Sequence, residues 1–422
     1  GGEEVSVTEY TMSEILSSVY RLMERTGLQE GILFLDEINC VSETLAPMML
    51  QFLQCKTFGN QALPEGWLIV AAGNPPEYNK SVRDFDVVTL DRVKRIDVEE
   101  DYGVWKEYAR RKNLHGAIRS YLDIKKDNFY RIENTADGLQ FATARGWEDL
   151  SELLYAYETL GIRADREVVG QYIQMPRIAK DFANYLEMFY KYQKTYHVEG
   201  ILSGTWENIT VLELREAPFD EKLSVMGLVL SRLSEEARNT RCQDALTDAL
   251  HTSLTEFREK IADAPPLTVL DQLLWKRRTA MKQAKEAGQL DKESRDLKQR
   301  EINALEDYRQ QLDREAVAPE GAMDAVRGWF GEEVERRKAM AMETKDMFDN
   351  AFRFLETTFG DSQELVIFVT EITAGYDTSW FVEQFGCDAY FRHNRELLFD
   401  STRHRIREEI AAAKAAEQEE NT

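Results

Sequence analysis

The chain has 422 residues, of which 43% are hydrophobic and 31% are charged, and its formal net charge is −23. This composition excludes a broadly disordered chain, and the length fits two or three domains. An acidic surface repels phosphate backbones, so non-specific binding to nucleic acids is disfavoured. No apolar run is long enough for a membrane span, and four scattered cysteines indicate reduced thiols in a cytoplasmic protein.

Strands that alternate with helices are predicted in the first part of the chain. After a short strand at residues 3–10, a helix begins near Thr11, which can cap it, and ends before Gly27. The run GILFLDEIN (31–39) predicts a strand buried on both faces, and WLIVAA (67–72) predicts a second strand. This alternation is typical of an α/β layer with a parallel sheet.

The remainder of the chain is predicted to be helical. We expect a partial α/β core over residues 1–101, a small helical lid over 102–199 and a helical interaction module over 200–422. In the last segment, leucines recur at nearly heptad spacing and predict a helical hairpin or a short coiled-coil stripe. The stripe consists of Leu290, Leu297, Leu305 and Leu312.

Two short segments within these helical regions have patterns that also suit β-structure. A small hairpin is predicted around Asp137 and Gly138, inside the lid. The run LVIFV (365–369) is ambiguous between a strand and a buried helix. Helix is favoured there because everything around the run is helical.

Two adjacent acids, Asp36 and Glu37, follow the first apolar strand. Ligands of open α/β sheets bind at the carboxyl ends of the strands, so this pair is a candidate site of nucleotide hydrolysis. Asp36 would hold Mg²⁺ through its water shell, and Glu37 would orient and deprotonate the attacking water. The alternative, a strand that simply ends in solvated acids, has at least equal weight for this short pattern alone.

Further candidates are an amide and three arginines. Asn74 follows the second apolar strand and could hydrogen-bond a γ-phosphate, or it could form an ordinary turn. Arg92, with Arg95 close by, could act as an arginine finger on a neighbouring subunit, or it could pair with a nearby acid. Arg145 could close over a nucleotide, or it could pair with Asp149. Taken singly, each is more typical of a structural residue.

The order of these segments resembles AAA+ ATPases of the MoxR and dynein-related group, over roughly the first half of the chain. ILFLDEIN (32–39) resembles the Walker B strand, and GNPPEY (73–78) resembles sensor 1 of that group. TLDRVKRI (89–96) resembles the arginine-finger segment, and TARGWEDLS (143–151) resembles sensor 2 in the lid.

The resemblance implies that ATP and Mg²⁺ bind between subunits. It places Asp36 on the metal, with Glu37 and Asn74 as catalytic residues of the same subunit. Arg92 would reach over from the neighbouring subunit, and Arg95 is the competing finger that could contact the nucleotide instead.

The resemblance also implies a chaperone-like remodelling factor in the form of a ring, with a hexamer as the expected state. Lid rotation, reported by Arg145 at the nucleotide, would move the helical module against a protein client. Members of the group often work with a von Willebrand A-type partner. No membrane is implied, and nucleic acid is not an expected partner.

One motif that such an ATPase needs does not occur in the sequence. The phosphate-binding loop GxxxxGK[ST] is missing from the 422 residues, and in the family's order it would precede residue 1. We therefore expect the chain to belong to a longer protein. By itself it should bind ATP poorly and hydrolyse little or none.

Three alternatives remain open. The first is a nucleic-acid motor of the restriction type, against which the net charge counts. The second is an AAA+ scaffold that does not hydrolyse ATP, and the third is a helical binding protein with an α/β cap. The basic cluster WKRR (275–278) is interpreted as a solvated helix face among many acids rather than as a nucleic-acid site.

Overall fold

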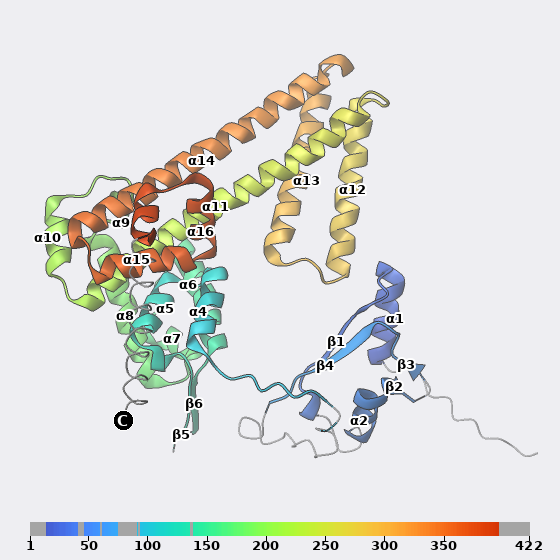
Figure 1. Cartoon of the computed structure of the whole chain (residues 1–422). Coiled ribbons are helices and arrows are strands. Elements are labelled where there is room, and N and C mark those ends of the chain that lie inside the picture. Colours follow the sequence, from blue (N-terminus) through green and yellow to red (C-terminus); the bar gives the residue numbers. More distant parts are fainter. Residues whose placement is uncertain are drawn as a thin grey trace, which may run out of the picture. The chain divides into compact units, whose positions relative to one another are not determined.

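The computed structural model describes most of the chain. The described residues are 14–40, 46–59, 61–74, 91, 93–135 and 138–395. Within them the protein is mostly helical, with a small parallel sheet and two short β-hairpins (Figure 1). None of the described helices is both long and apolar enough to cross a bilayer.

The chain divides into two compact units that each draw on two separate stretches. The first unit comprises residues 1–99 and 260–315, and the second comprises 100–259 and 316–422. The predicted boundary between core and lid lies within three residues of the first division. The predicted boundary near residue 200 lies inside the second unit.

Two parallel strands form the centre of the first unit. β1 (Gly31–Leu35) and β4 (Trp67–Ala71) pair in parallel along their whole lengths, which confirms the predicted parallel sheet. The helices α1 (Glu14–Thr26) and α2 (Ala46–Cys55) contribute to the hydrophobic core beneath the sheet. Phe52 of α2 is fully buried there. The short strands of the β2–β3 hairpin are Thr57–Phe58 and Gln61–Ala62.

One face of this sheet is exposed, which corrects the prediction of a strand buried on both faces. Side chains alternate between the two faces of a strand. Leu33 and Ile69 pack on the core, whereas Ile32 is 64% exposed and Phe34 is 58% exposed. The core helices cover only the first of these faces. In the described part of this unit, this run of consecutive apolar residues therefore forms a strand with only one face covered by helices.

A helical hairpin forms the rest of the first unit. α12 (Pro266–Glu286) and α13 (Lys292–Arg314) pack against each other, as the leucine spacing predicted. Leu305 and Leu312 of that stripe are buried, together with Ile302, whereas Leu290 lies before the start of α13. The hairpin thus buries one apolar stripe, while its remaining faces carry charged side chains.

The second unit is almost entirely helical. Its described strands are β5 (Arg131–Thr135) and β6 (Gly138–Ala142), which form the predicted hairpin, although Asp137 lies outside the described residues. Its helices are α4 (Tyr102–Arg111), α5 (Gly116–Ile124), α6 (Ala144–Leu160), α7 (Arg166–Tyr172), α8 (Pro176–Thr195), α9 (Val198–Leu202), α10 (Asn208–Glu216), α11 (Phe219–Lys260), α14 (Ala322–Phe359), α15 (Gln363–Ala374) and α16 (Tyr376–Phe385).

Two long helices of this unit run antiparallel to each other (Figure 1). The buried hydroxyls of Thr240 on α11 and Thr344 on α14 lie 3.0 Å apart. Further along, the Gln243 amide donates to a carboxylate oxygen of Glu333 at 2.8 Å. Polar side chains therefore join the two helices. The α15 helix confirms the helical interpretation of LVIFV, and its Phe368 is fully buried.

An aromatic core holds the lid part of the second unit together. Trp147 of α6 is fully buried, packs edge-on against Phe182 at 5.3 Å between ring centroids, and donates its Nε1–H to the Phe129 carbonyl at 3.0 Å. α6 begins after Thr143, whose hydroxyl accepts the backbone N–H of Gly146. This cap and the buried indole fix the first turn of the helix.

Candidate functional site

The carboxyl ends of β1 and β4 lie side by side in the first unit. Beyond the last paired residues, the N–H of Ala72 donates to the carbonyl of Leu35 at 2.9 Å. The N–H of Ile38 then donates to the carbonyl of Ala72, also at 2.9 Å. These bonds draw the turn after β1 against the turn after β4. The polar residues that follow the two strands are therefore brought together, as predicted for parallel strands.

Glu37 has an unusual backbone conformation in this turn. Its φ is 50°, in the left-handed region that residues other than glycine seldom adopt. The Asp36 carboxylate accepts the backbone N–H of Glu37 at 3.0 Å, and Ile38 anchors the turn in the core with 5% exposure. Both acids are exposed to solvent. A strained residue held by its neighbours is a common feature of functional sites.

Both carboxylate oxygens of Glu37 accept hydrogen bonds. The Asn74 amide donates to Oε1 at 2.6 Å, and the Cys40 thiol donates to Oε2 at 3.1 Å. This hydrogen bond, followed by desolvation and the negative charge of Glu37, raises the pKa of the Cys40 thiol. The two predicted residues Glu37 and Asn74 are thus in direct contact. Cys40 was not predicted, because its contact depends on the short helical turn at Ile38–Cys40.

A second amide supports the backbone of Asn74. The side-chain N–H of Asn39 donates to the Asn74 carbonyl at 2.7 Å. A Cβ atom at position 73 would lie 2.3 Å from Oδ1 of Asn39, so glycine is required at Gly73 for this close approach. Oδ1 of Asn39 is buried and has no hydrogen-bond partner among the described residues. Sequence reasoning gave Asn39 no role.

Of the three predicted arginines, only Arg95 is described within the first unit, and its ion-pair partner is not a residue of this cluster. Arg92 lies outside the described residues. Arg95 is exposed, and its Nε–H donates to Asp97 at 2.7 Å. Arg145 is exposed on the first turn of α6, which belongs to the second unit. The structure therefore brings Asp36 and Glu37 together with Asn74. The proposed roles of the three arginines remain predictions.

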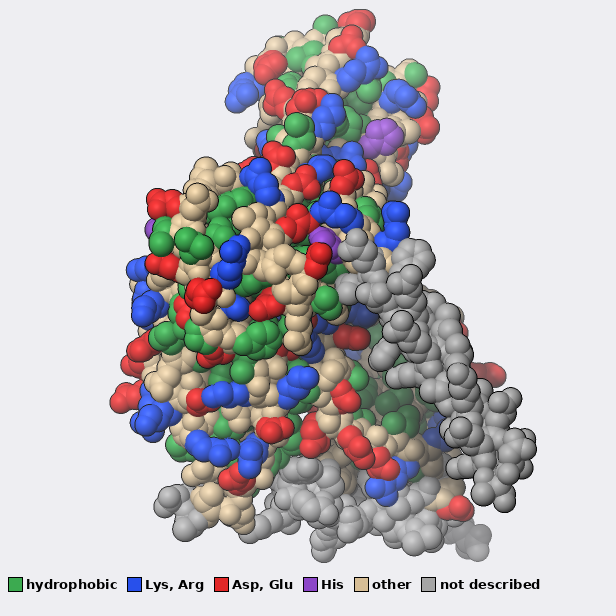
Figure 2. Space-filling view, turned by 60° about the vertical axis from the view of Figure 1, so that its left-hand side comes forward, with side chains coloured by type: hydrophobic (Ala, Val, Ile, Leu, Met, Phe, Trp, Pro, Cys, Tyr) green, Lys and Arg blue, Asp and Glu red, His purple; other side chains and the backbone are tan. Residues whose placement is uncertain are grey.

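The basic cluster at 275–278 pairs with acids of the neighbouring helix. Arg277 on α12 binds Glu301 on α13 at 2.9 Å, and Arg278 forms an ion pair with Glu306. On the face shown in Figure 2, basic and acidic side chains are mixed rather than gathered into a single basic surface. These pairings agree with the interpretation of the cluster as a charged helix face.

Comparison of the chain with protein-family models, with curated proteins and with solved structures finds no match. The arrangement of the side chains is therefore the basis for inferring function. Its central feature is a carboxylate, Glu37, that is positioned by an amide from the neighbouring strand. Asp36 lies beside it at the open edge of the sheet. A carboxylate in this position can accept a proton from water, and carboxylate oxygens are ligands that hydrated divalent cations prefer.

Proposed function

We propose that this chain carries the Walker B, sensor 1 and arginine-finger segments of an AAA+ ATPase of the MoxR or dynein-related group. The observation that carries the proposal is the 2.6 Å hydrogen bond from Asn74 to Glu37, at the ends of adjacent parallel strands. The sequence motifs predicted that these two residues act together. Their contact requires both strands to be adjacent, parallel and in the observed register.

The chemistry would be divided among three residues. Asp36 would hold Mg²⁺ mainly through water. No described cluster of His, Cys, Asp or Glu can hold a metal by itself, so the other ligands would be waters and phosphate oxygens. Glu37 would orient and deprotonate the attacking water, with Asn74 fixing its carboxylate or contacting the γ-phosphate. Because Glu37 and Asn74 are already held in contact before ATP binds, less conformational entropy would be lost when ATP binds.

The remaining parts of an ATP site would come from elsewhere. The phosphate-binding loop is not in the 422 residues, so this proposal requires a longer protein that supplies it. Arg92 or Arg95 would stabilise the transition state from a neighbouring subunit, and Arg145 would sense the nucleotide from the lid. ATP binding by the chain alone is then expected to be weak.

The cellular role in this proposal is remodelling of a protein client. A ring, a hexameric state and a von Willebrand A-type partner are further parts of it, and all three rest on the resemblance alone. The cytoplasmic location rests on the scattered cysteines. The long antiparallel helices α11 and α14 and the hairpin α12–α13 offer extended charged surfaces for such a client. The net charge of −23 weighs against nucleic acid as that client.

The decisive measurement is phosphate release by the protein extended upstream to include its phosphate-binding loop. We expect turnover by the extended wild type and a loss of about 10²–10⁴-fold in Glu37→Gln, because the general base is removed. Glu30→Gln is the matched control. Glu30 is an exposed acid just before β1, at the opposite end of the strand from Asp36 and Glu37, and its replacement should leave turnover unchanged.

Two results would change the proposal. If the extended wild type binds ATP but releases no phosphate, the protein is a scaffold of the same fold. If Glu30→Gln lowers turnover as much as Glu37→Gln, the acids at the strand ends have no special role. Retention of bound ATP by Glu37→Gln would support the assigned role.

A further inference from the structure

A hollow of about 820 Å³ lies on the second unit and is lined by basic residues from several elements. Its walls come from the end of α5, the short turn at Lys126–Asn128, the start of β5 and the first turns of α8. Five basic and three acidic side chains line it, in a chain whose net charge is −23. The local excess of positive charge therefore opposes the charge of the whole protein. Its volume falls in the range of small-molecule sites.

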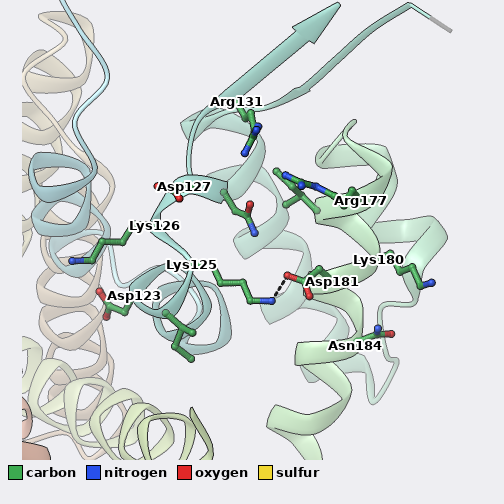
Figure 3. Close-up of a pocket in the computed structure, with 12 residues that line it drawn as sticks. Asp123, Lys125, Lys126, Asp127, Arg131, Arg177, Lys180, Asp181 and Asn184 are labelled. Atoms are coloured by element: carbon green, nitrogen blue, oxygen red, sulfur yellow. Dashed lines mark hydrogen bonds and ion pairs between the residues drawn. The ribbon is translucent and has the colours of Figure 1, made fainter. Parts of the chain in front are cut away.

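Two arginines from separate elements face this hollow. Arg131 lies at the start of β5, and Arg177 lies in the first turn of α8 (Figure 3). Arg131 uses Nε to bind Glu133 at 2.6 Å. Within the described ranges, Arg177 has no carboxylate at ion-pair distance. Like charges that approach each other favour an anion between them.

One acid that lines the hollow, Asp181, is already engaged by other donors. Asp181 accepts a hydrogen bond from Lys125 Nζ at 2.5 Å and from the Tyr121 hydroxyl at 2.8 Å. Burial tends to raise the pKa of Asp181, but these donors outweigh it and hold the pKa below its usual range. Figure 3 shows Asp181 meeting Lys125 below the arginines, while Lys180 points away. Asp181 therefore holds Lys125 in place and leaves Arg177 available for a ligand.

The backbone at the start of α8 adds to the positive electrostatic potential of the hollow. The helix begins after Met175, which provides no side-chain cap, and its first residue is Pro176. The following residues Arg177 and Ile178 line the hollow. First-turn N–H groups have no partner within the helix, and the positive end of the helix dipole favours an anion.

We propose that this hollow binds an oligophosphate, a small anion with two or more linked phosphoryl groups. One phosphoryl group would bind to Arg177, and a second would bind to the free edge of Arg131. Guanidinium groups suit this ligand because they form paired hydrogen bonds to phosphate oxygens. Arginines on two elements select for a ligand with more than one anionic group. This proposal does not depend on ATP hydrolysis in the first unit.

The test is calorimetric titration of the 422-residue chain with inorganic tripolyphosphate at low ionic strength. We expect one site per chain, with affinity at least tenfold lower in the double variant Arg131→Ala/Arg177→Ala. Arg327→Ala/Lys338→Ala is the matched control, because it removes two exposed positive charges from α14. Its affinity should equal that of the wild type. Arg177→Ala alone provides a milder variant, and circular dichroism checks that each variant is folded.

Several outcomes would overturn the proposal. Absence of binding by the wild type would do so, as would equal weakening by the control variant, which would show general charge attraction. Orthophosphate that binds as tightly as tripolyphosphate would refute selection for linked phosphoryl groups. Loss of binding in Asp36→Asn would place the ligand in the first unit instead. Retained binding in Asp36→Asn separates this site from the proposed ATP site.

Discussion

The side-chain amide of Asn74 donates a 2.6 Å hydrogen bond to Oε1 of Glu37, across 37 positions of sequence. The contact exists because β1 and β4 pair in parallel and end together. It leaves Oε2 of Glu37 to accept the thiol of Cys40. The cluster can therefore be examined through a thiol that reports on the Glu37 carboxylate, without any nucleotide.

Alkylation of Cys40 should become faster when Glu37 is replaced by Gln. The hydrogen bond to Glu37 raises the pKa of the Cys40 thiol, so less reactive thiolate is present at a given pH. Removing the carboxylate lowers that pKa towards its ordinary value. The rate of iodoacetamide labelling at pH 8, followed at Cys40 by mass spectrometry, should rise severalfold. Labelling of Cys55 in the same sample is the internal control, and equal rates at Cys40 in both proteins would contradict the contact.

Gly73→Ala should loosen the cluster without removing any of its polar groups. The new Cβ would meet Oδ1 of Asn39 at 2.3 Å, so the Asn39 side chain must turn away from the Asn74 carbonyl. We expect a loss of about 1 kcal/mol in the free energy of unfolding, the usual contribution of one hydrogen bond. Urea unfolding of the first unit measures it.

The companion experiment uses Asn39→Ala, which removes the obstructing side chain. In that background Gly73→Ala should cost much less, because the clash and the hydrogen bond are both gone. Additive costs of the two changes would show that Gly73 and Asn39 do not interact.

The helices of the fold could be predicted because the hydrophobic spacing of each segment favours the same structure as the segments beside it in sequence. Three of the four stripe leucines (Leu297, Leu305 and Leu312) lie in α13, and the run at 365–369 lies in α15, where the neighbouring segments are also helical. The exposed face of β1 could not be predicted. A row of apolar residues such as that around Phe34 indicates that both faces of a strand can be buried. Whether a second layer of helices covers the second face depends on residues elsewhere in the chain.

The candidate site could be predicted only in part, because some of its contacts depend on backbone geometry and on elements far apart in sequence. Asp36, Glu37 and Asn74 follow apolar strands, and parallel strands bring such residues together. The contact of Cys40 depends on the left-handed backbone of Glu37, which no sequence pattern signals for a glutamate. The basic hollow is lined by residues from Asp123 to Asn184, on several elements, so no local motif marks it.

Trp147 and Arg145 are neighbours in sequence but should respond very differently to replacement. Trp147→Ala removes a fully buried indole and should cost about 3–5 kcal/mol in unfolding free energy. Arg145 is exposed, so Arg145→Ala should change stability by less than about 0.5 kcal/mol. Urea titrations monitored by circular dichroism give both values. A large cost for Arg145→Ala would mean that this arginine is structural and not available to a nucleotide.

Glu371 should make the second unit sensitive to acid. Lys106 and Arg110 bind its carboxylate at 2.7 and 2.6 Å, and the side chain is 18% exposed. Burial tends to raise the pKa of Glu371, but the two positive charges outweigh it and hold the pKa below its usual range. A carboxyl with a depressed pKa stabilises the fold above its unfolded pKa of about 4.3. That stability is lost as the pH falls through the folded pKa.

Glu371→Gln should therefore destabilise the second unit by about 3 kcal/mol at pH 7, because Arg110 loses its carboxylate partner and Lys106 keeps only Asp123. The difference from the wild type should shrink as the pH falls below the unfolded pKa of about 4.3 and through the lower folded pKa. Urea unfolding at pH 7, 5 and 3 measures this change. Glu383→Gln, at an exposed acid on α16, is the matched control and should have little effect at any pH. A cost for Glu371→Gln that stays constant from pH 7 to 3 would show that its charge is not what stabilises the unit.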